Sequence, residues 1–511
     1  MMTLEEVVMQ LQKHGLYKET VTDGHWDYEL TDQQEQLKVE HLSYDSRQVQ
    51  PGTLFMCKGN HFKPEYADKA IDGGAIALVT ELVMTDDLAA DHQQVPQIIV
   101  TDMHKAMAVI ARAFYGEPDK ELTMIGITGT KGKTTTTYFI WHMLNELFPG
   151  QAGRLTSIDS CVDGKTFFDS HLTTPEALDL FRMLRQAADN HLKYLVMEVS
   201  SQAYKMSRVY GIKYQYGAFL NISPDHISPV EHPTFDDYLY CKSQLVVNSE
   251  RFFINRSTDY YDVIAKKARH YQLPLVTFGS DKTDADYRFT SGNGGKFSVA
   301  TFDDGLPQII GDFQTKIPGD FNDSNATAAM SIVAQINNDL AKMKQGISET
   351  TVPGRMEMLT DKDGIEACVD YAHDYLSFTK AFNYLKSSHP EGRLIVVTGS
   401  AGGKAESRRA DIGKVLSKYA DVAILTSEDN FFEDPHKIDN DIKDNITNPD
   451  VEVHINVDRV SAIKQAYEMA KPGDVIFEAA KGRETFMHDK GHDIPYIGDY
   501  QLTRQMMGLD K

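Results

Sequence analysis

The chain has 511 residues, of which 41% are hydrophobic and 25% are charged, and its formal charge is −22 at pH 7. This composition is that of a globular protein, and the length predicts about three domains at roughly 100–200 residues each. The negative charge argues against nucleic acid or an anionic membrane as a partner, because either would need a broad basic surface.

The cysteines and the N-terminus predict a cytoplasmic protein. Cys57, Cys161, Cys241 and Cys368 lie far apart and show neither CxxC pairing nor metal-finger spacing, so we expect reduced thiols. The N-terminus is acidic and amphipathic, unlike a signal peptide. No stretch approaches the ~20 apolar residues that span a bilayer, so we expect no membrane insertion.

The first block of the chain, residues 1–118, mixes strand-like runs with helical patterns. Residues 74–79 and 97–100 are predicted strands. The polar turn at 116–120 then separates this block from an apolar segment, residues 122–127, which is a third predicted strand.

A phosphate-binding loop follows that strand, because residues 128–135 read TGTKGKTT and a helical pattern begins near Tyr138. Loop N–H groups and the helix dipole can cradle a polyphosphate, while Lys133 reaches its outer oxygens and Thr134 ligates magnesium. Ile127 replaces the first glycine of the general GxxxxGK[ST] pattern, and a chance glycine-rich turn is the alternative. The predicted nucleotide-binding residues are Gly129, Thr130, Lys131, Gly132, Lys133, Thr134 and Thr135.

Polar residues at the ends of later strands are the next candidates, since ligands of parallel sheets lie beyond the strands' carboxyl ends. Glu198 ends the predicted strand 194–199, where it can hold magnesium or be a solvated charge. His226 ends the segment 219–226, although a single histidine is more often structural. By spacing alone, Lys242 is an ordinary lysine on a helix surface.

The last block, residues 351–511, alternates helices with strands such as 394–398 and 422–426. This alternation predicts parallel sheets here and in the middle block, 119–350. The expected fold is therefore α/β with three domains: a smaller N-terminal domain, a central phosphate-loop ATPase domain and a Rossmann-like C-terminal domain.

Six segments resemble, in order and spacing, the UDP-N-acetylmuramoyl-tripeptide synthetases of the Mur ligase family. These ATP-dependent enzymes join an amino acid to a carboxylate through an acyl phosphate. The segments are residues 44–47, 128–135, 172–176, 197–201, 221–226 and 370–373.

The resemblance implies a catalytic centre with ATP and two magnesium ions. Lys133, His226 and Lys242 match the catalytic residues, and Lys242 matches a lysine that is carbamylated in these ligases. Carbon dioxide on this amine would turn a cation into a carboxylate that can hold magnesium. The implied metal-site residues are Thr134, Glu198, His226 and carbamylated Lys242.

The resemblance also places the acceptor substrate, UDP-N-acetylmuramoyl-L-alanyl-D-glutamate. Ser46 matches the residue that contacts the UDP end, in a UDP-binding domain formed by residues 1–118. Thr173, Thr174, Ser200 and Arg208 match positions that hold the muramoyl dipeptide. Hydroxyl groups and an arginine fork suit phosphate and carboxylate oxygens, although serine and threonine after a strand are more often caps or turns.

The third block resembles the family's amino-acid-binding domain. Asn325, Arg355, Asp370 and His373 match residues that meet ATP. Arg409 matches the arginine that binds the α-carboxylate of the incoming amino acid. We expect a monomer.

The identity of that amino acid depends on residues 428–431. Diaminopimelate-adding relatives carry Asp-Asn-Pro-Arg where this chain has Glu-Asp-Asn-Phe. The arginine is missing, and Glu428 and Asp429 can attract the ε-ammonium of L-lysine. We therefore expect lysine, with meso-diaminopimelate, L-ornithine or a simple polar turn as alternatives.

A second departure lies at residues 480–484, where the family usually has Gly-Lys-Gly-His-Glu and this chain has Ala-Lys-Gly-Arg-Glu. Glu484 remains available for the α-ammonium of the substrate. Alanine in place of glycine changes the backbone if Ala480 needs an unusual dihedral angle.

Three other functions use the same phosphate loop. A folylpolyglutamate synthetase would need a folate site in place of the UDP-binding block, and a small-molecule kinase would release a phosphorylated product. A noncatalytic nucleotide-dependent regulator would not need Glu198, His226 and Lys242 together.

Overall fold

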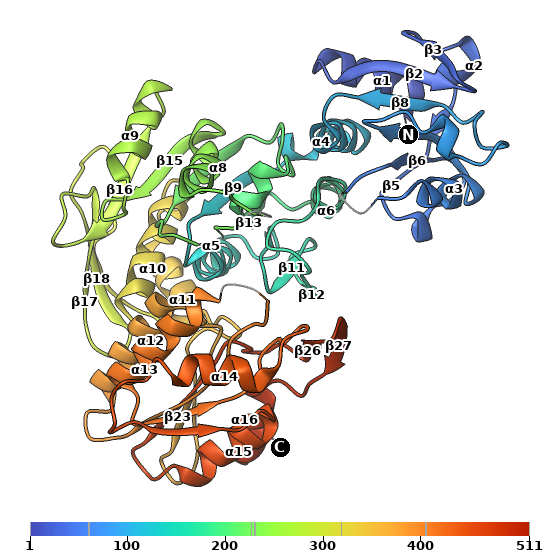
Figure 1. Cartoon of the computed structure of the whole chain (residues 1–511). Coiled ribbons are helices and arrows are strands. Elements are labelled where there is room, and N and C mark those ends of the chain that lie inside the picture. Colours follow the sequence, from blue (N-terminus) through green and yellow to red (C-terminus); the bar gives the residue numbers. More distant parts are fainter. Residues whose placement is uncertain are drawn as a thin grey trace. The chain divides into compact units, whose positions relative to one another are not determined.

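Helices alternate with mostly parallel strands through the chain, and this confirms the predicted α/β class (Figure 1). The computed structural model describes residues 2–59, 62–225, 227–228, 231–317, 319–403 and 406–509. Contacts divide the chain into two units, the first comprising 1–288, 300–310 and 327–346, and the second comprising 289–299, 311–326 and 347–511. The predicted three-domain boundaries stay a prediction.

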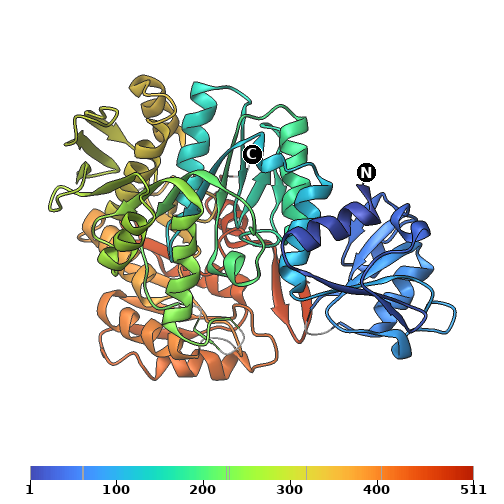
Figure 2. The ribbon, with the colours of Figure 1, turned by 90° about the horizontal axis from the view of Figure 1, so that it is seen from above.

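The first unit begins with a six-stranded sheet in the order β3-β2-β8-β7-β6-β5 (blue in Figures 1 and 2). Strands β5 to β8 pair in parallel, and β2 and β3 are antiparallel additions. The strands are β2 (Tyr17–Thr22), β3 (His25–Asp27), β5 (His41–Ser43), β6 (Thr53–Met56), β7 (Ala75–Thr80) and β8 (Gln97–Val100). The helices packed on them are α1 (Leu4–Lys13), α3 (Pro64–Asp72) and α4 (Met103–Phe114).

The central sheet of the first unit is parallel from β10 through β13, β9, β14 and β15 to β16. Its strands are β9 (Thr123–Thr128), β10 (Ala152–Leu155), β13 (Tyr194–Glu198), β14 (Tyr214–Phe219), β15 (Ser249–Asn255) and β16 (Leu275–Ser280), with β11 (Asp159–Cys161) and β12 (Phe168–Asp169) antiparallel at one edge. The helices of this part are α5 (Lys133–Leu147), α6 (Ala177–Asp189), α7 (Ser201–Lys205), α8 (Phe235–Val247) and α9 (Tyr261–His270).

Two glycines allow α8 to approach this sheet closely. A Cβ atom on Gly126 would lie 3.0 Å from the Leu245 side chain, and one on Gly217 would lie 3.3 Å from it. Because glycine has no side chain, the helix that carries Lys242 packs directly over β9 and β14. Among the described residues, one hydrophobic core runs through both sheets of this unit, from Leu4 to Ala268, and a smaller one, from Phe55 to Leu88, lies in the N-terminal part.

The second unit contains a six-stranded sheet in the order β20-β21-β25-β22-β23-β24. All its pairs are parallel except β20 with β21. Its strands are β20 (Glu357–Thr360), β21 (Glu366–Asp370), β22 (Leu394–Thr398), β23 (Val422–Leu425), β24 (Glu452–Ile455) and β25 (Val475–Ala479). Its helices are α12 (Tyr375–Ser388), α13 (Ser407–Tyr419), α14 (Pro435–Lys443), α15 (Arg459–Met469) and α16 (Asp499–Met506), and β26 (Phe486–Asp489) and β27 (His492–Pro495) form a hairpin.

The remaining elements are short or run across the division between the units. They are β1 (Met2–Thr3), α2 (Asp32–Glu35), β4 (Lys38–Val39), β17 (Tyr287–Ser291), β18 (Lys296–Thr301), β19 (Gly311–Gln314), α10 (Asp320–Val333), α11 (Leu340–Glu349) and three short 3-10 helices. All four cysteines are buried free thiols. Within the described residues, no helix combines the length and the apolar character needed to cross a bilayer.

Candidate active site

The phosphate loop connects β9 to α5 at the carboxyl end of the central sheet. Gly132 has a φ of 86° and caps the helix, so α5 begins at Lys133 and not near Tyr138 as the sequence predicted. The first turn is threonine-rich and lacks apolar periodicity, which explains the late prediction. The Lys133 amine donates to the carbonyl oxygens of Gly129 at 2.9 Å and Thr130 at 3.2 Å. The loop thus combines a helix N-terminus with a lysine amine, a combination that suits a polyphosphate.

A group of oxygen donors lies beside this loop. Glu198 ends β13 and is only 1% exposed, so it is not the solvated charge that the sequence left open. Its Oε1 accepts from the Ser157 backbone N–H at 2.8 Å, and the Ser157 hydroxyl lies 3.2 Å from the Thr134 hydroxyl. One carboxylate and two hydroxyl groups are hard oxygen ligands, so the residues present fit a magnesium ion.

Lys242 lies in the same place and is not a surface lysine. It is 2% exposed, and its amine donates to the carbonyl oxygen of Gly129 at 2.8 Å. Burial lowers the pKa of Lys242 well below its usual value, and the nearby charge of Lys133 lowers it further. The structure therefore brings Lys133, Thr134, Glu198 and Lys242 together. His226, the remaining predicted catalytic residue, lies outside the described residues.

Three of the residues predicted to hold the muramoyl dipeptide, Thr174, Ser200 and Arg208, are linked to the Glu198 backbone by hydrogen bonds. Thr174 is buried, donates to the Glu198 carbonyl oxygen at 2.9 Å and accepts from the Ser200 N–H at 3.1 Å. Thr173 precedes it in the chain. Arg208 donates to the Thr174 carbonyl oxygen at 3.1 Å and to Glu176 at 2.8 Å. Its buried Nε has no partner among the described residues, so one guanidinium donor remains for an anion.

Ser46 lies in a 3-10 helix of residues 46–48 that follows β5, where Asp45 caps the turn by accepting from the Arg47 N–H. Nearby residues connect the N-terminal sheet to the central part of the first unit. The Tyr44 hydroxyl donates to Asp179 at 2.6 Å, and the Lys58 amine pairs with Glu176 at 2.7 Å.

In the second unit, the residues predicted to meet ATP surround or flank Tyr371, apart from Asn325. The ring of Tyr371 is packed against Gly354 and Gly482, where a Cβ atom would overlap it. The Arg355 guanidinium lies 5.1 Å from the ring centroid. Asp370 accepts from the backbone N–H groups of Met356 and Ala372, and His373 contacts the Tyr371 carbonyl oxygen at 2.7 Å. Asn325, on α10, bonds to Asn322 at 3.2 Å.

Arg409, the predicted carboxylate-binding arginine, already has carboxylate partners. It is 2% exposed and donates to both oxygens of Glu433 and to Asp441, at 2.6 to 2.8 Å. Its Nε is a buried donor without a partner among the described residues. An incoming carboxylate would therefore use this atom or displace one of the acids.

The predicted amino-acid pocket has an internal lysine. The Lys481 amine, which is 1% exposed, pairs with Asp429 at 2.9 Å and with Glu484 at 2.5 Å. Among the described residues, the Glu428 carboxylate has no hydrogen bond. Desolvation raises the pKa of Glu428 to about 7, and the charge of Asp429 adds to this shift.

The unusual residues at 480 and 483 both have clear structural effects. Ala480 has a φ of 82°, a conformation that favours glycine. Arg483 pairs with Glu357, and its guanidinium lies 3.8 Å from the ring centroid of Tyr500. Phe431, which stands where diaminopimelate-adding relatives have arginine, stacks on His488 with the ring centroids 5.3 Å apart.

Comparison with known proteins identifies the family. The profile described as Mur ligase middle domain matches residues 127–333, and the profile described as Mur ligase, glutamate ligase domain matches residues 354–482. The chain belongs to the Mur ligase family. This confirms the resemblance found in the sequence.

Full-length relatives of this Mur ligase are known. It is 43% identical to the UDP-N-acetylmuramoyl-L-alanyl-D-glutamate–L-lysine ligase of Enterococcus faecalis (strain ATCC 700802 / V583), and the alignment covers 96% of each chain. A solved UDP-N-acetylmuramoyl-L-alanyl-D-glutamate–2,6-diaminopimelate ligase shares the fold, with a TM-score of 0.64, 24% identity and coverage of 94% of this chain and 97% of that one. The MurF ligase of Thermotoga maritima, solved with ADP, has a TM-score of 0.61, 18% identity and coverage of 88% and 95%.

Four residues of this Mur ligase site were not singled out from the sequence. Ser157 bridges Thr134 and Glu198, and Lys58 pairs with Glu176. The Asn221 side chain accepts from the Lys131 N–H at 2.9 Å and donates to its carbonyl oxygen at 3.0 Å, which braces the phosphate loop. Lys481 neutralises Asp429 and Glu484. Asn221 follows an apolar strand, so its position at a strand end was a usable signal, whereas the partners of Ser157, Lys58 and Lys481 are distant in sequence.

Proposed function

We propose that this Mur ligase joins L-lysine to the D-glutamate of UDP-N-acetylmuramoyl-L-alanyl-D-glutamate, with hydrolysis of ATP to ADP and phosphate, in the synthesis of peptidoglycan precursors. The observation that carries the proposal is 43% identity over 96% of the chain to a ligase named for that reaction. The group formed by the buried Thr134, Glu198 and Lys242 and the half-buried Lys133, at the carboxyl end of the central sheet, supports it.

The reaction needs no nucleophile from the protein. The γ-carboxylate of D-glutamate attacks the γ-phosphorus of ATP, the bond from that phosphorus to the β–γ bridging oxygen breaks, and an acyl phosphate and ADP form. The α-amine of lysine then attacks the acyl carbon, loses a proton and expels phosphate. Charge spreads over the phosphoryl oxygens during the first step, so catalysis depends on positioning and on electrostatic stabilisation.

The residues of the first unit supply these two effects. The backbone N–H groups at the start of α5 and the Lys133 amine would bind the phosphates, and Asn221 holds the loop in place. Thr134, Ser157 and Glu198 would hold magnesium, which neutralises phosphate charge when bound. The free Nε of Arg208 and the half-buried hydroxyl group of Ser200 are suited to orient the acceptor carboxylate, whereas the buried Thr174 hydroxyl positions Glu198 and Ser200.

The environment of Lys242 supports carbamylation. Only a neutral amine attacks carbon dioxide, and burial beside Lys133 favours the neutral form of Lys242. A carbamate at this position would convert the buried amine into a negative group near Lys133 and add an oxygen ligand for a second magnesium ion.

The second unit supports lysine as the amino acid. Phe431 gives the pocket no cation for a second substrate carboxylate, and Glu428 is a carboxyl group without a bonded partner among the described residues. A substrate ε-ammonium would supply the missing positive charge. Meso-diaminopimelate carries an extra carboxylate, which Glu428, unpaired within the described part of the chain, would disfavour, whereas Asp429 is already paired with Lys481.

One assay tests the proposal. It measures phosphate release by the purified chain in the presence of ATP, magnesium and the UDP-dipeptide. We expect release to require both the dipeptide and a diamino acid, with L-lysine giving the highest kcat/KM, above L-ornithine and meso-diaminopimelate. A phosphorylated product without peptide formation would indicate a kinase, and a preference for meso-diaminopimelate would overturn the assignment of the pocket.

A further inference from the structure

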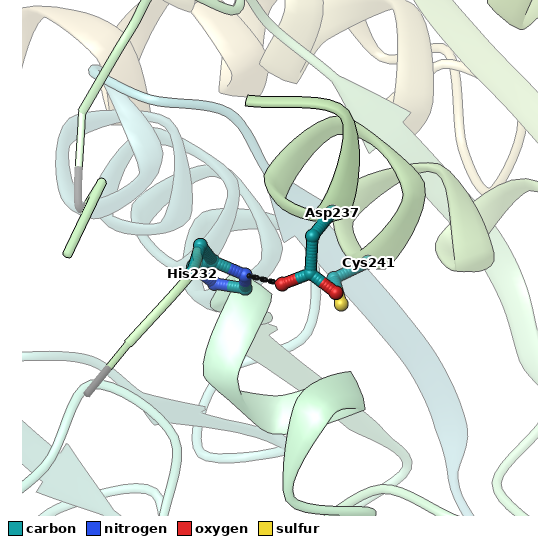
Figure 3. A group of neighbouring side chains, drawn as sticks. All are labelled: His232, Asp237 and Cys241. Carbon is teal, nitrogen blue, oxygen red and sulfur yellow. Dashed lines mark hydrogen bonds and ion pairs between the residues drawn. The ribbon is translucent and has the colours of Figure 1, made fainter. Parts of the chain in front are cut away.

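A fully buried histidine links the starts of two helices that flank the catalytic group. His232 is 0% exposed, and its Nδ1 lies 2.6 Å from Oδ2 of Asp237, in the first turn of α8 (Figure 3). Its Nε2 lies 2.9 Å from the hydroxyl of Ser201, the first residue of α7. Because a carboxylate only accepts, Nδ1 carries the hydrogen, and in the neutral ring Nε2 accepts the Ser201 hydroxyl hydrogen.

Both helices carry parts of the site. Ser201 follows Ser200, and Glu198 lies three residues before Ser201 at the end of β13. Further along α8, Tyr238 lies with its hydroxyl 3.1 Å from the Thr130 hydroxyl in the phosphate loop, and Lys242 lies with its amine 4.8 Å from the Tyr238 ring centroid. The His232 ring also packs edge-on against Tyr238, at 5.2 Å between centroids. A shift of His232 would therefore move Tyr238 and Lys242 relative to Glu198 and the loop.

The Asp237–His232–Ser201 arrangement is not suited to nucleophilic catalysis. Ser201 is 4% exposed and its hydroxyl is engaged with the His232 ring, so an acyl group has no access to it. A hydroxyl nucleophile must reach its substrate carbonyl as well as its base.

The neighbouring thiol of Cys241 does not convert the group into a metal centre. His232, Asp237 and Cys241 place ligand atoms within 4.8 Å of one another. Figure 3 shows these three side chains side by side. However, Oδ2 of Asp237 also accepts from the Lys205 ammonium at 2.7 Å. A cation bound here would meet the positive charge of Lys205 and would have to displace two hydrogen bonds of His232 or Asp237.

We propose that His232 is a positioning residue for catalysis, which holds the first turn of α8 against the start of α7 so that Tyr238 and Lys242 meet the phosphate loop beside Glu198. This inference rests on the proposed function for its kinetic consequence. Its structural content is that binding of magnesium and nucleotide, and not binding of the diamino acid, depends on His232.

The experiment compares His232→Ala with His92→Ala in the full chain. His92 is a suitable control because it also pairs with an aspartate, Asp68, at 2.7 Å, but in the N-terminal sheet region. Calorimetry with ATP and magnesium measures binding without turnover, and steady-state kinetics separates kcat from KM for L-lysine. For His232→Ala we expect about tenfold weaker nucleotide binding in magnesium and about tenfold lower kcat, with KM for lysine within about twofold of the parent value.

Two milder variants keep the test informative if His232→Ala fails to fold. His232→Asn retains an amide that can donate to Asp237, and Ser201→Ala removes only the Nε2 contact. We expect His232→Asn to recover most of the nucleotide affinity and Ser201→Ala to lose a smaller part of it. His92→Ala should behave as the parent does.

The outcomes are distinct. Equal losses of affinity for nucleotide and for lysine in folded His232→Ala or His232→Asn protein would indicate a general structural role and would overturn the proposal. Nucleotide binding and kcat like those of the parent in His232→Ala would also overturn it. Stoichiometric cobalt uptake with a thiolate absorption band that Cys241→Ser abolishes would also overturn it. If the parent protein releases no phosphate with any diamino acid, the proposed function fails, while the calorimetric comparison still tests His232.

Discussion

At the scale of single residues, two positions destabilise the folded state, and the rest of the fold must offset this free energy. Ala480 adopts a φ of 82° at the end of β25, where the family usually has glycine, and its N–H still donates to the Asp370 carbonyl oxygen at 3.0 Å. Asp439, on α14, is 1% exposed, and neither of its carboxylate oxygens has a hydrogen-bond partner among the described residues. The sequence raised the question about Ala480 but gave no sign of Asp439, since its burial depends on tertiary packing.

Replacement of Ala480 by glycine should stabilise the second unit. The left-handed conformation costs alanine roughly 1–2 kcal/mol, and the greater freedom of glycine in the unfolded chain offsets part of the gain. We expect Ala480→Gly to raise the free energy of unfolding by about 1 kcal/mol, measured by urea denaturation. The control is Ala470→Gly, at a position with negative φ, which should destabilise the protein. Equal destabilisation by both changes would contradict the argument.

Asp439→Asn should stabilise the protein more as pH rises. Burial raises the pKa of Asp439 to about 7, whereas an aspartate in the unfolded chain titrates near ~3.9. Between these values the unfolded chain binds fewer protons than the folded chain, so stability falls as pH rises and the loss is complete above about pH 7. The asparagine variant removes this loss. We expect its gain over the parent, measured by thermal unfolding, to be larger at about pH 8 than at about pH 6.

The matched control for Asp439 is Asp444→Asn, at the exposed end of the same helix. This variant should show the same pH dependence as the parent. A gain in Asp439→Asn that does not change with pH would mean that the carboxyl group does not titrate as described.

At the scale of elements, apolar runs predicted strands of the N-terminal and C-terminal sheets well. β8 and β22 match their predicted ranges, 97–100 and 394–398, because buried parallel strands are continuous hydrophobic segments. The start of α5 was wrong by five residues, since polar threonines at a phosphate loop hide the helix period. The contribution of α8 was also hidden, because the glycines at 126 and 217 that let α8 and its Lys242 approach the sheet lie far away in sequence.

Lys242→Ala tests what α8 contributes to the reaction. Without the amine no carbamate forms, so we expect turnover to fall by more than about a hundredfold and excess bicarbonate to leave it unrestored. Phosphate release measures activity, and carbon-13 NMR of protein exposed to labelled carbon dioxide measures the carbamate. The control is Lys267→Ala, which removes a partly buried lysine of α9 that donates to Ser243 on α8, next to Lys242. Full activity of Lys242→Ala would exclude the carbamate.

At the scale of the whole molecule, each unit has a hydrophobic core of its own among the described residues. One core includes residues from Leu4 to Ala268, and another lies wholly within the second unit, from Leu359 to Met507. The family and most of the nucleotide site were predictable because their residues sit in contiguous motifs. The ion pairs of Lys481 with Asp429 and of Arg409 with Glu433 were not, because their partners are distant in sequence and only the folded second unit brings them together.

Two separate cores predict two steps in thermal unfolding. We expect differential scanning calorimetry of the full chain to resolve two transitions, because each core can melt as its own cooperative unit. L-lysine without nucleotide should raise the transition of the second unit by mass action and leave the other unchanged. L-alanine serves as the control ligand. A single transition that lysine shifts as a whole would show that the cores unfold together.

The carbonyl oxygen of Gly129 accepts hydrogen bonds from both Lys133 and Lys242. Under the proposed chemistry, the Lys242 amine becomes a carbamate, and Lys133 is left as the sole amine that donates to this oxygen. The concentration of dissolved carbon dioxide would then set the fraction of enzyme molecules that carry the carbamate and are active. Protein prepared in degassed buffer should therefore show a low initial rate of phosphate release, and this rate should rise as the solution takes up carbon dioxide from the air.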